Sequence, residues 1–175
     1  MNYQTIINTC YSGDASIKLS KAEELVAIHG DQLLARPDIK AHLALIAELV
    51  QSLDTHMSTM DMGKTCTHCA KTPEGGCCSA YMGNENPDSL LLLMNILAGV
   101  KVERVCENGV ECCFLGTKGC ILLFKPIFCL NYLCERIQNE SDRDELGILE
   151  KKTGKLLTAQ SNLEQVLILF LQKQR

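Results

Sequence analysis

The chain has 175 residues, of which four are prolines, 46% are hydrophobic and 22% are charged. These proportions exclude a disordered chain and indicate one globular domain, which at this length buries enough surface to fold without disulfides. The net charge of −4 and the lack of tryptophan argue against a basic, base-stacking surface, so we expect no nucleic-acid partner.

Residues 1–18 lack the basic start, apolar run and small-residue cleavage site of a secretory signal. We therefore expect a cytoplasmic protein, in which reducing conditions favour metal or redox roles for cysteines over disulfides. The longest apolar run, Leu90–Val100, is shorter than the about 20 residues that span a bilayer. It predicts a buried helix and no membrane partner.

Two helices are predicted before residue 60. Ser20 and Glu23 have the spacing of a capping box and Gly30 can end a helix, which predicts a helix over about 21–29. Pro37 suits the first turn of a second helix. An apolar stripe at helical spacing follows it, formed by Ile39, Leu43, Ile46, Val50 and Leu53. We expect this stripe to pack on the domain's own core, and a coiled-coil homodimer is the alternative.

Helical periodicity is lost between Met57 and Asn86, where Gly, Cys, Pro and Asn dominate. A structureless stretch of this length is uncommon inside a compact domain, so we expect a bound metal to order it. Asn86, Pro87 and Asp88 then resemble a helix cap, a first-turn proline and an acid that matches the helix dipole. They predict a leucine-rich helix that Gly99 ends.

A β-hairpin is predicted next, because Asn108 and Gly109 stand between the β-prone runs Val102–Cys106 and Val110–Leu115. Two helices are predicted after it. One begins at Ser141 and ends near Gly154, and the other begins near Ser161 and ends at Phe170.

These elements predict a mostly α fold, a small helical domain with an irregular cysteine-rich metal-binding face and one short β-hairpin. We expect a single domain over 1–175 with three parts: N-terminal helices over 1–60, a cysteine-cluster region over 66–134 and C-terminal helices over 138–175.

Ten of the 11 cysteines lie between Cys66 and Cys134. The pair Cys66 and Cys69 has the C-x-x-C spacing at which two thiolates from one turn reach the same metal. The spacing of the others brings the candidate ligands to eight: Cys66, Cys69, Cys77, Cys78, Cys113, Cys120, Cys129 and Cys134. One zinc ion or one cubane cluster takes four thiolates, so either two sites exist or spare cysteines surround one site.

The metal is expected to be zinc or the iron of an iron–sulfur cluster, [4Fe–4S] or [2Fe–2S], since four thiolates hold either. Adjacent side chains in extended backbone point opposite ways, so Cys77 and Cys78 are expected to reach different atoms. That geometry favours the cluster over a single zinc ion. His68, between the two cysteines of the C-x-x-C pair, is expected to point to solvent.

The cysteine region resembles the YkgJ-type cysteine-cluster family, described as zinc- or iron-chelating domains. In that family a C-x-x-C and a CC pair precede a block that reads C-x-[FL]-L, then G-C, then R-P-x-x-C-R-x-[FY]-x-C. The corresponding segments here are Cys66 to Cys78, Cys113-Phe114-Leu115, Gly119-Cys120 and Lys125 to Cys134. The resemblance covers about residues 66–134 and implies a metal-chelating domain.

This chain departs from the family pattern in three places. Lys125 replaces the arginine before proline, Leu130 replaces the arginine after Cys129, and the gap between Cys120 and Cys129 is shortened by one. A cation that would neutralise a thiolate cluster is thus changed at one position and lost at the other. Cys10, Cys106 and Cys112 fall outside the family blocks and are expected to be small buried residues. Cys112 is also able to exchange roles with Cys113.

We expect a binding protein more than an enzyme, because no cysteine has the sequence context of a catalytic nucleophile and the C-x-x-C pair does not follow a strand. The predicted function is a cytosolic metal-binding protein with a role in electron transfer, metal handling or binding of a protein partner. One alternative is a zinc-ordered adaptor. Another is a component of a redox or methyltransferase-like enzyme, since some flagellin lysine methylases carry a similar cysteine pattern.

Overall fold

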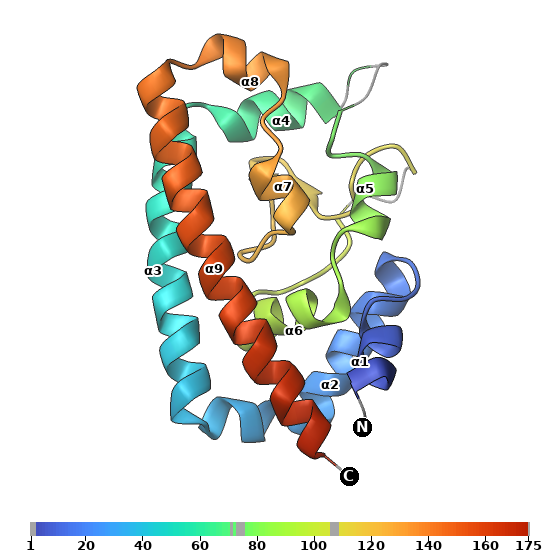
Figure 1. Cartoon of the computed structure of the whole chain (residues 1–175). Coiled ribbons are helices and arrows are strands. Elements are labelled where there is room, and N and C mark those ends of the chain that lie inside the picture. The colour runs from blue at the N-terminus through green and yellow to red at the C-terminus, as the bar shows by residue number, and fades with distance from the viewer. Residues whose placement is uncertain (1–2, 71, 73–75, 106–108, 175) are drawn as a thin grey trace.

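The computed structural model describes residues 3–70, 72, 76–105 and 109–174. The predicted mostly α fold is confirmed, and Figure 1 shows the arrangement of its helices. The helices are α1 (Tyr3–Cys10), α2 (Ala15–Ala35), α3 (Pro37–Thr59), α4 (Met62–Ala70), α5 (Ala80–Glu85), α6 (Ser89–Leu97), α7 (Ile127–Asn131), α8 (Glu135–Glu140) and α9 (Arg143–Lys173). The antiparallel strands are β1 (Leu115–Gly116) and β2 (Gly119–Cys120).

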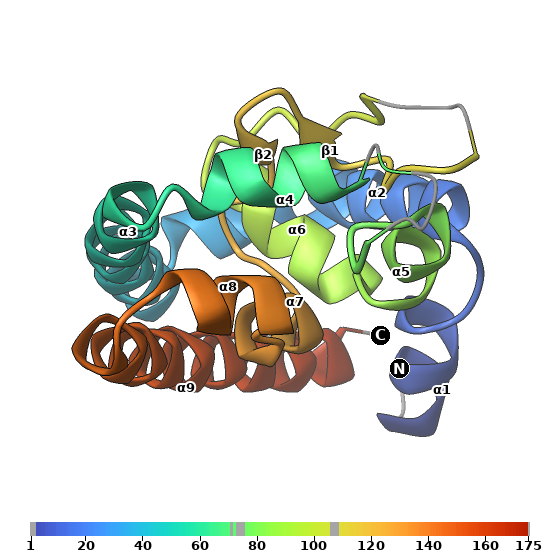
Figure 2. The same ribbon diagram turned by 90° about the horizontal axis from the view of Figure 1, so that it is seen from above.

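Two long helices, α3 and α9, pack against each other and form one wall of the molecule (Figure 1). The predicted stripe of α3 is buried within the chain at Ile39, Ile46, Val50 and Leu53. In Figure 2, α4 lies beside the hairpin and α7 lies beside α9, in agreement with their contacts. None of the described helices is both long and apolar enough to cross a membrane.

The first long helix begins earlier than predicted. Asp14 is its N-cap, and the Asp14 carboxylate accepts hydrogen bonds from the amides of Ser16 and Ile17 at 2.9 and 3.0 Å. An aspartate satisfies these first-turn amides well, so α2 starts six residues before the predicted start at about 21. Gly30 lies inside the helix, where it is buried, and does not end it.

The C-terminal region forms one helix where two were predicted. Asp142, not Ser141, caps α9 in a capping box with Glu145. Gly154 is exposed in the middle of α9 and does not interrupt it. A glycine costs a helix about 1 kcal/mol relative to alanine, and the burial of Leu149 and Leu156 on either side offsets that cost.

The predicted hairpin exists at another position. Leu115 pairs with Cys120 and Gly116 pairs with Gly119, so the turn lies at Thr117 and Lys118. Within the second predicted strand, Glu111 forms an isolated bridge with Ser79. Residues 106–108, which include Asn108 of the predicted turn, lie outside the described residues. The segment after residue 109 therefore pairs with the chain just before α5.

Two short helices, α4 and α5, occupy much of the stretch predicted to be irregular. Asp61, with φ of 52°, makes the turn between α3 and α4. Ser79 caps α5 by accepting a hydrogen bond from the amide of Met82. Both cysteines of the C-x-x-C pair consequently lie on a helix, one turn apart.

Asn95 is the polar centre of the apolar helix α6 and is fully buried. Its amide nitrogen donates to the carbonyl oxygens of Leu91 and Phe124 at 2.9 and 3.0 Å. Its amide oxygen accepts from the backbone amides of Leu123 and Phe124 at 2.8 and 3.0 Å. These bonds hold the chain that leads from β2 to α7 across the middle of α6.

We predict that Asn95→Ala lowers the free energy of unfolding by about 3–5 kcal/mol, because three backbone groups of Leu123 and Phe124 lose their buried partners. Urea denaturation followed by circular dichroism measures this change. The control is Asn162→Ala at an exposed position of α9, which should stay within about 0.5 kcal/mol of wild type. Equal effects of the two substitutions would contradict the role of Asn95.

Candidate metal centre

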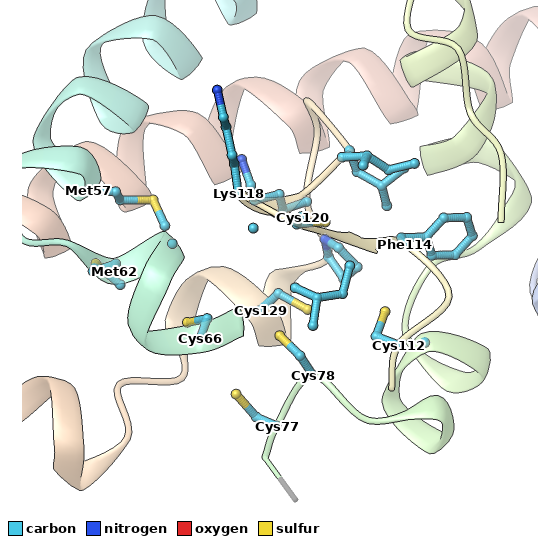
Figure 3. Close-up of a pocket in the computed structure, with 18 of the residues that line it drawn as sticks. Met57, Met62, Cys66, Cys77, Cys78, Cys112, Phe114, Lys118, Cys120 and Cys129 are labelled. Carbon is cyan, nitrogen blue, oxygen red and sulfur yellow. The ribbon is translucent and has the colours of Figure 1, made fainter. Parts of the chain in front are cut away.

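Eight of the described cysteines of the 66–134 region come together from several segments of the chain. Cys66 and Cys69 lie one turn apart on α4, and Cys77 and Cys78 precede α5. Four more follow later in the chain: Cys112 shortly before β1, Cys120 in β2, Cys129 in α7 and Cys134 at the N-cap of α8. Figure 3 shows six of these side chains around one cavity.

One group of thiols surrounds a hollow of about 20 Å³, which we name the ion-sized hollow. This volume is about that of one water-sized sphere. The cysteines that line the hollow come from three separate segments and are Cys66, Cys69, Cys77, Cys78 and Cys134. Thr65, Gly76 and Arg136 complete the lining.

A second, larger space of about 320 Å³ adjoins the first, and we name it the thiol cavity (Figure 3). Its cysteines are Cys66, Cys77, Cys78, Cys112, Cys120 and Cys129. Three of them, Cys66, Cys77 and Cys78, also line the ion-sized hollow, so the two spaces share a wall of thiols. Apolar side chains such as Met57, Met62 and Phe114 line other parts of the cavity.

Seven of the eight predicted ligands line one or both spaces, and Cys113 is the exception. Cys113 is buried in the hydrophobic core together with Phe114 and Leu115. Its neighbour Cys112 lines the thiol cavity instead. The two adjacent cysteines thus take each other's expected positions. Cys10 is buried as expected, and Cys106 lies outside the described residues.

The adjacent Cys77 and Cys78 differ from the extended geometry that we expected. Their backbone is bent, and the thiol of Cys78 donates a hydrogen bond to the sulfur of Cys77. This bond lowers the pKa of Cys77 and, with burial, raises the pKa of Cys78. The two sulfurs therefore lie together, and both residues line both spaces.

Burial raises the pKa of several other thiols. The pKa of Cys66 is raised to about 11 by burial, and also by the nearby thiols of Cys77 and Cys134. The Cys129 residue is exposed overall, yet its sulfur points into the cavity (Figure 3), and loss of solvent raises its pKa to about 12. Since metals bind thiolates, an ion that enters must displace these protons, and its affinity should rise with pH.

Two glycines stand directly against thiols. A Cβ atom on Gly76 would lie 2.9 Å from the Sγ of Cys69, and a Cβ on Gly83 would lie 2.9 Å from the Sγ of Cys112. Real Cβ atoms do not approach so closely, so only glycine leaves both sulfurs where they are. Gly76 lines the ion-sized hollow and Gly83 lines the thiol cavity.

A buried cation also lines the thiol cavity. The Lys125 side chain is 10% exposed, and its Nζ lies 3.2 Å from the Oδ1 of Asp54 on α3. The Lys125 carbonyl accepts a hydrogen bond from the side chain of Gln160 at 3.1 Å. Its positive charge opposes the burial that raises the pKa of both Cys120 and Cys129. Lys125 therefore favours thiolates on this side of the cavity.

The thiols are not arranged around a single point. Among the described residues, no three His, Cys, Asp or Glu side chains are placed to hold one metal ion together. Coordination by these cysteines therefore requires side-chain rotation toward the ion. The donors themselves suit zinc or iron, because both metals bind clustered thiolates. His68 is exposed on α4, as expected.

No protein-family model, curated protein or solved structure matches this chain. The similarity to the YkgJ-type family accordingly rests on the cysteine spacing alone, and the site must be interpreted from its own geometry.

We predict that Cys78→Ala slows alkylation of Cys77 several-fold at pH 7 in the reduced, metal-free protein. Without the hydrogen bond from Cys78 the pKa of Cys77 rises toward that of an ordinary thiol, so less thiolate is present to react. Mass spectrometry after iodoacetamide treatment measures the rate. Cys78→Ser keeps a hydroxyl donor and should react closer to wild type. A slowing that is equally large at pH 10 would instead indicate lost access.

Proposed function

We propose that the protein binds metal, and that the thiolates of Cys66, Cys69, Cys77 and Cys134 hold one ion in the ion-sized hollow. The observation that carries this proposal is that five cysteines from three segments line one space of about 20 Å³. The fifth, Cys78, stabilises Cys77 as a thiolate through its hydrogen bond. A hollow of this size with thiol walls suits one dehydrated ion better than an organic ligand.

Zinc is the ion that we propose for this hollow. It is bound by four thiolates at about 2.3 Å in a tetrahedral arrangement, so it needs little more space than the sulfurs enclose. An iron–sulfur cluster contains several metal atoms and bridging sulfides, and it would require these cysteines to move apart. The size of the hollow thus supports zinc here over the cluster that the expected extended geometry favoured.

The role that we propose for the ion is structural. It would join α4, the segment before α5 and the start of α8. Binding energy of a structural zinc adds directly to folding energy, because the assembled site does not exist in the unfolded chain. The cytoplasm suits this role, since its reducing conditions keep such cysteines as thiols.

A second candidate role is that of an adaptor, in which the metal orders a surface for a protein partner. The observation that favours it is the apolar exposure of α7 and its end, where Ile127 is 65% exposed and Tyr132 is 47% exposed beside Cys129 and Cys134. The ring of Tyr132 stacks on Phe128 with centroids 5.1 Å apart, which adds a second aromatic ring to this surface.

We predict that protein produced with zinc and purified without oxygen retains one zinc per chain, and that Cys69→Ser or Cys134→Ser lowers zinc affinity at least tenfold. Elemental analysis and competition with a chromophoric chelator measure content and affinity. Cys10 is buried at the end of α1, far in sequence from the other cysteines, so Cys10→Ala is the matched control and should bind as wild type. Unchanged zinc in both serine variants would rule out this hollow as the site.

We also predict that Gly76→Ala weakens zinc binding, because the new methyl group displaces the Sγ of Cys69. Gly154→Ala is the control, since a Cβ there meets nothing within 4 Å. It should leave zinc affinity unchanged and raise the free energy of unfolding by about 1 kcal/mol, the helix preference of alanine over glycine. Chelator competition and urea denaturation on both variants test this pair, and equal zinc affinity would contradict the packing argument.

A further inference from the structure

We infer that the thiol cavity binds an apolar monocarboxylate, whose carboxylate takes the place of Asp54 beside the ammonium group of Lys125. The inference goes beyond the proposed function, because it concerns an organic ligand and uses none of the proposed zinc ligands. Three features of the cavity carry it: its size and apolar walls, its buried cation, and the exposure of the aspartate that pairs with this cation.

The cavity has the size and the walls of a small-molecule pocket. Its volume is about 320 Å³, and ligand pockets span about 300–1,000 Å³. A dry cavity of about 150 Å³ holds one benzene molecule, so this one has room for about a dozen non-hydrogen atoms. In Figure 3, Met57 and Met62 lie on one side of the cavity and Phe114 lies on the other. These walls favour the apolar body of a ligand, and methionine side chains adapt to its shape.

The cation of the cavity is buried with one partner. The Lys125 side chain is 10% exposed. Among the described residues, its Nζ has a single hydrogen-bond acceptor, the Oδ1 of Asp54 at 3.2 Å. An ammonium group has three N–H donors, so two remain for a ligand. Because a buried charge is costly unless it is paired and hydrogen-bonded, a carboxylate is the group that this position favours.

Asp54 can leave the cation, whereas Lys125 is fixed in the wall of the cavity. The Asp54 side chain is 50% exposed, so its exchange of the ion pair for water costs little. The carbonyl oxygen of Lys125 accepts a hydrogen bond from Gln160, and Asn95 holds both backbone polar groups of the preceding Phe124. A cation that is already held in place needs little reordering when a ligand binds.

The position of the ion pair also sets the shape of the ligand. Met57 lies three residues after Asp54 on α3, so both side chains are on the same face of that helix. Both line the cavity. A ligand whose carboxylate replaces that of Asp54 therefore has its apolar body beside Met57. Lys118, exposed in the same lining, adds a second positive charge that favours an anion.

Titration of the reduced full chain with octanoate in an isothermal calorimeter tests this inference, and 1-octanol is the neutral comparison. Wild type should bind octanoate at least tenfold more tightly than 1-octanol, because only the acid forms a charged hydrogen bond with Lys125. Lys125→Met should weaken octanoate binding at least tenfold and leave 1-octanol unchanged. Asp54→Asn should bind octanoate several-fold more tightly than wild type, because the competing carboxylate is removed.

The matched controls come from the exposed ion pair between Lys101 and Glu103, which lies outside the cavity lining. Lys101→Met and Glu103→Gln should bind octanoate as wild type does. Three outcomes would overturn the inference: no binding of octanoate, equal affinity of wild type for octanoate and 1-octanol, or binding by Asp54→Asn that is no tighter than that of wild type.

The Asp54→Asn variant decides if Lys125→Met does not fold, as judged by circular dichroism, because tighter binding does not arise from misfolding. Cys69→Ser separates this inference from the proposed function. Cys69 lines the ion-sized hollow and not the thiol cavity, so this variant should lose zinc affinity and bind octanoate as wild type does.

Discussion

The buried amide of Asn95 is the interaction on which the cysteine arrangement depends. Four hydrogen bonds join it to its own helix and to Leu123 and Phe124, inside a mainly apolar core. Such a polar group in the core specifies one position of the crossing chain, because any shift would leave several buried groups unpaired. Cys120 lies just before that chain and Lys125 just after it. The packing of α6 therefore fixes where this side of the thiol cavity stands.

The two spaces share Cys66, Cys77 and Cys78, which has a thermodynamic consequence for whatever binds in either of them. A thiolate turned toward one space is withdrawn from the other, and a charge bound in one changes the field in both. Loss of a proton or binding of an ion in one space should therefore change the affinity of the thiols that face the other. Lys125, ion-paired with Asp54, lines the thiol cavity, where its charge favours thiolates at Cys120 and Cys129.

The sequence predicted the parts of the fold that have a strong local signal. Pro37 and the stripe from Ile39 to Leu53 predicted α3, and Asp88 with the leucine run predicted α6.

The helix α4 was missed because its threonines, glycine and cysteines have no apolar period, and tertiary packing decides its conformation. The hairpin was misplaced because residues after Gly109 pair with Ser79, a long-range choice that a turn motif does not encode. The candidate ligands followed from spacing except at Cys112 and Cys113, where only the core burial of Phe114 and Leu115 shows which one turns inward.

The contacts of Gly76 and Gly83 with cysteine sulfurs have a consequence for tracing the ancestry of this chain. A side chain at either glycine would displace the neighbouring cysteine sulfur, so the glycine should be inherited together with that cysteine. A pattern of cysteines alone is therefore an incomplete signature. The fuller one is C-x2-C-x6-G-C-C-x4-G, from Cys66 to Gly83, followed by the CC pair at Cys112. Distant relatives should be recognised by glycines that covary with these thiols, even where the lengths of the connecting loops have diverged.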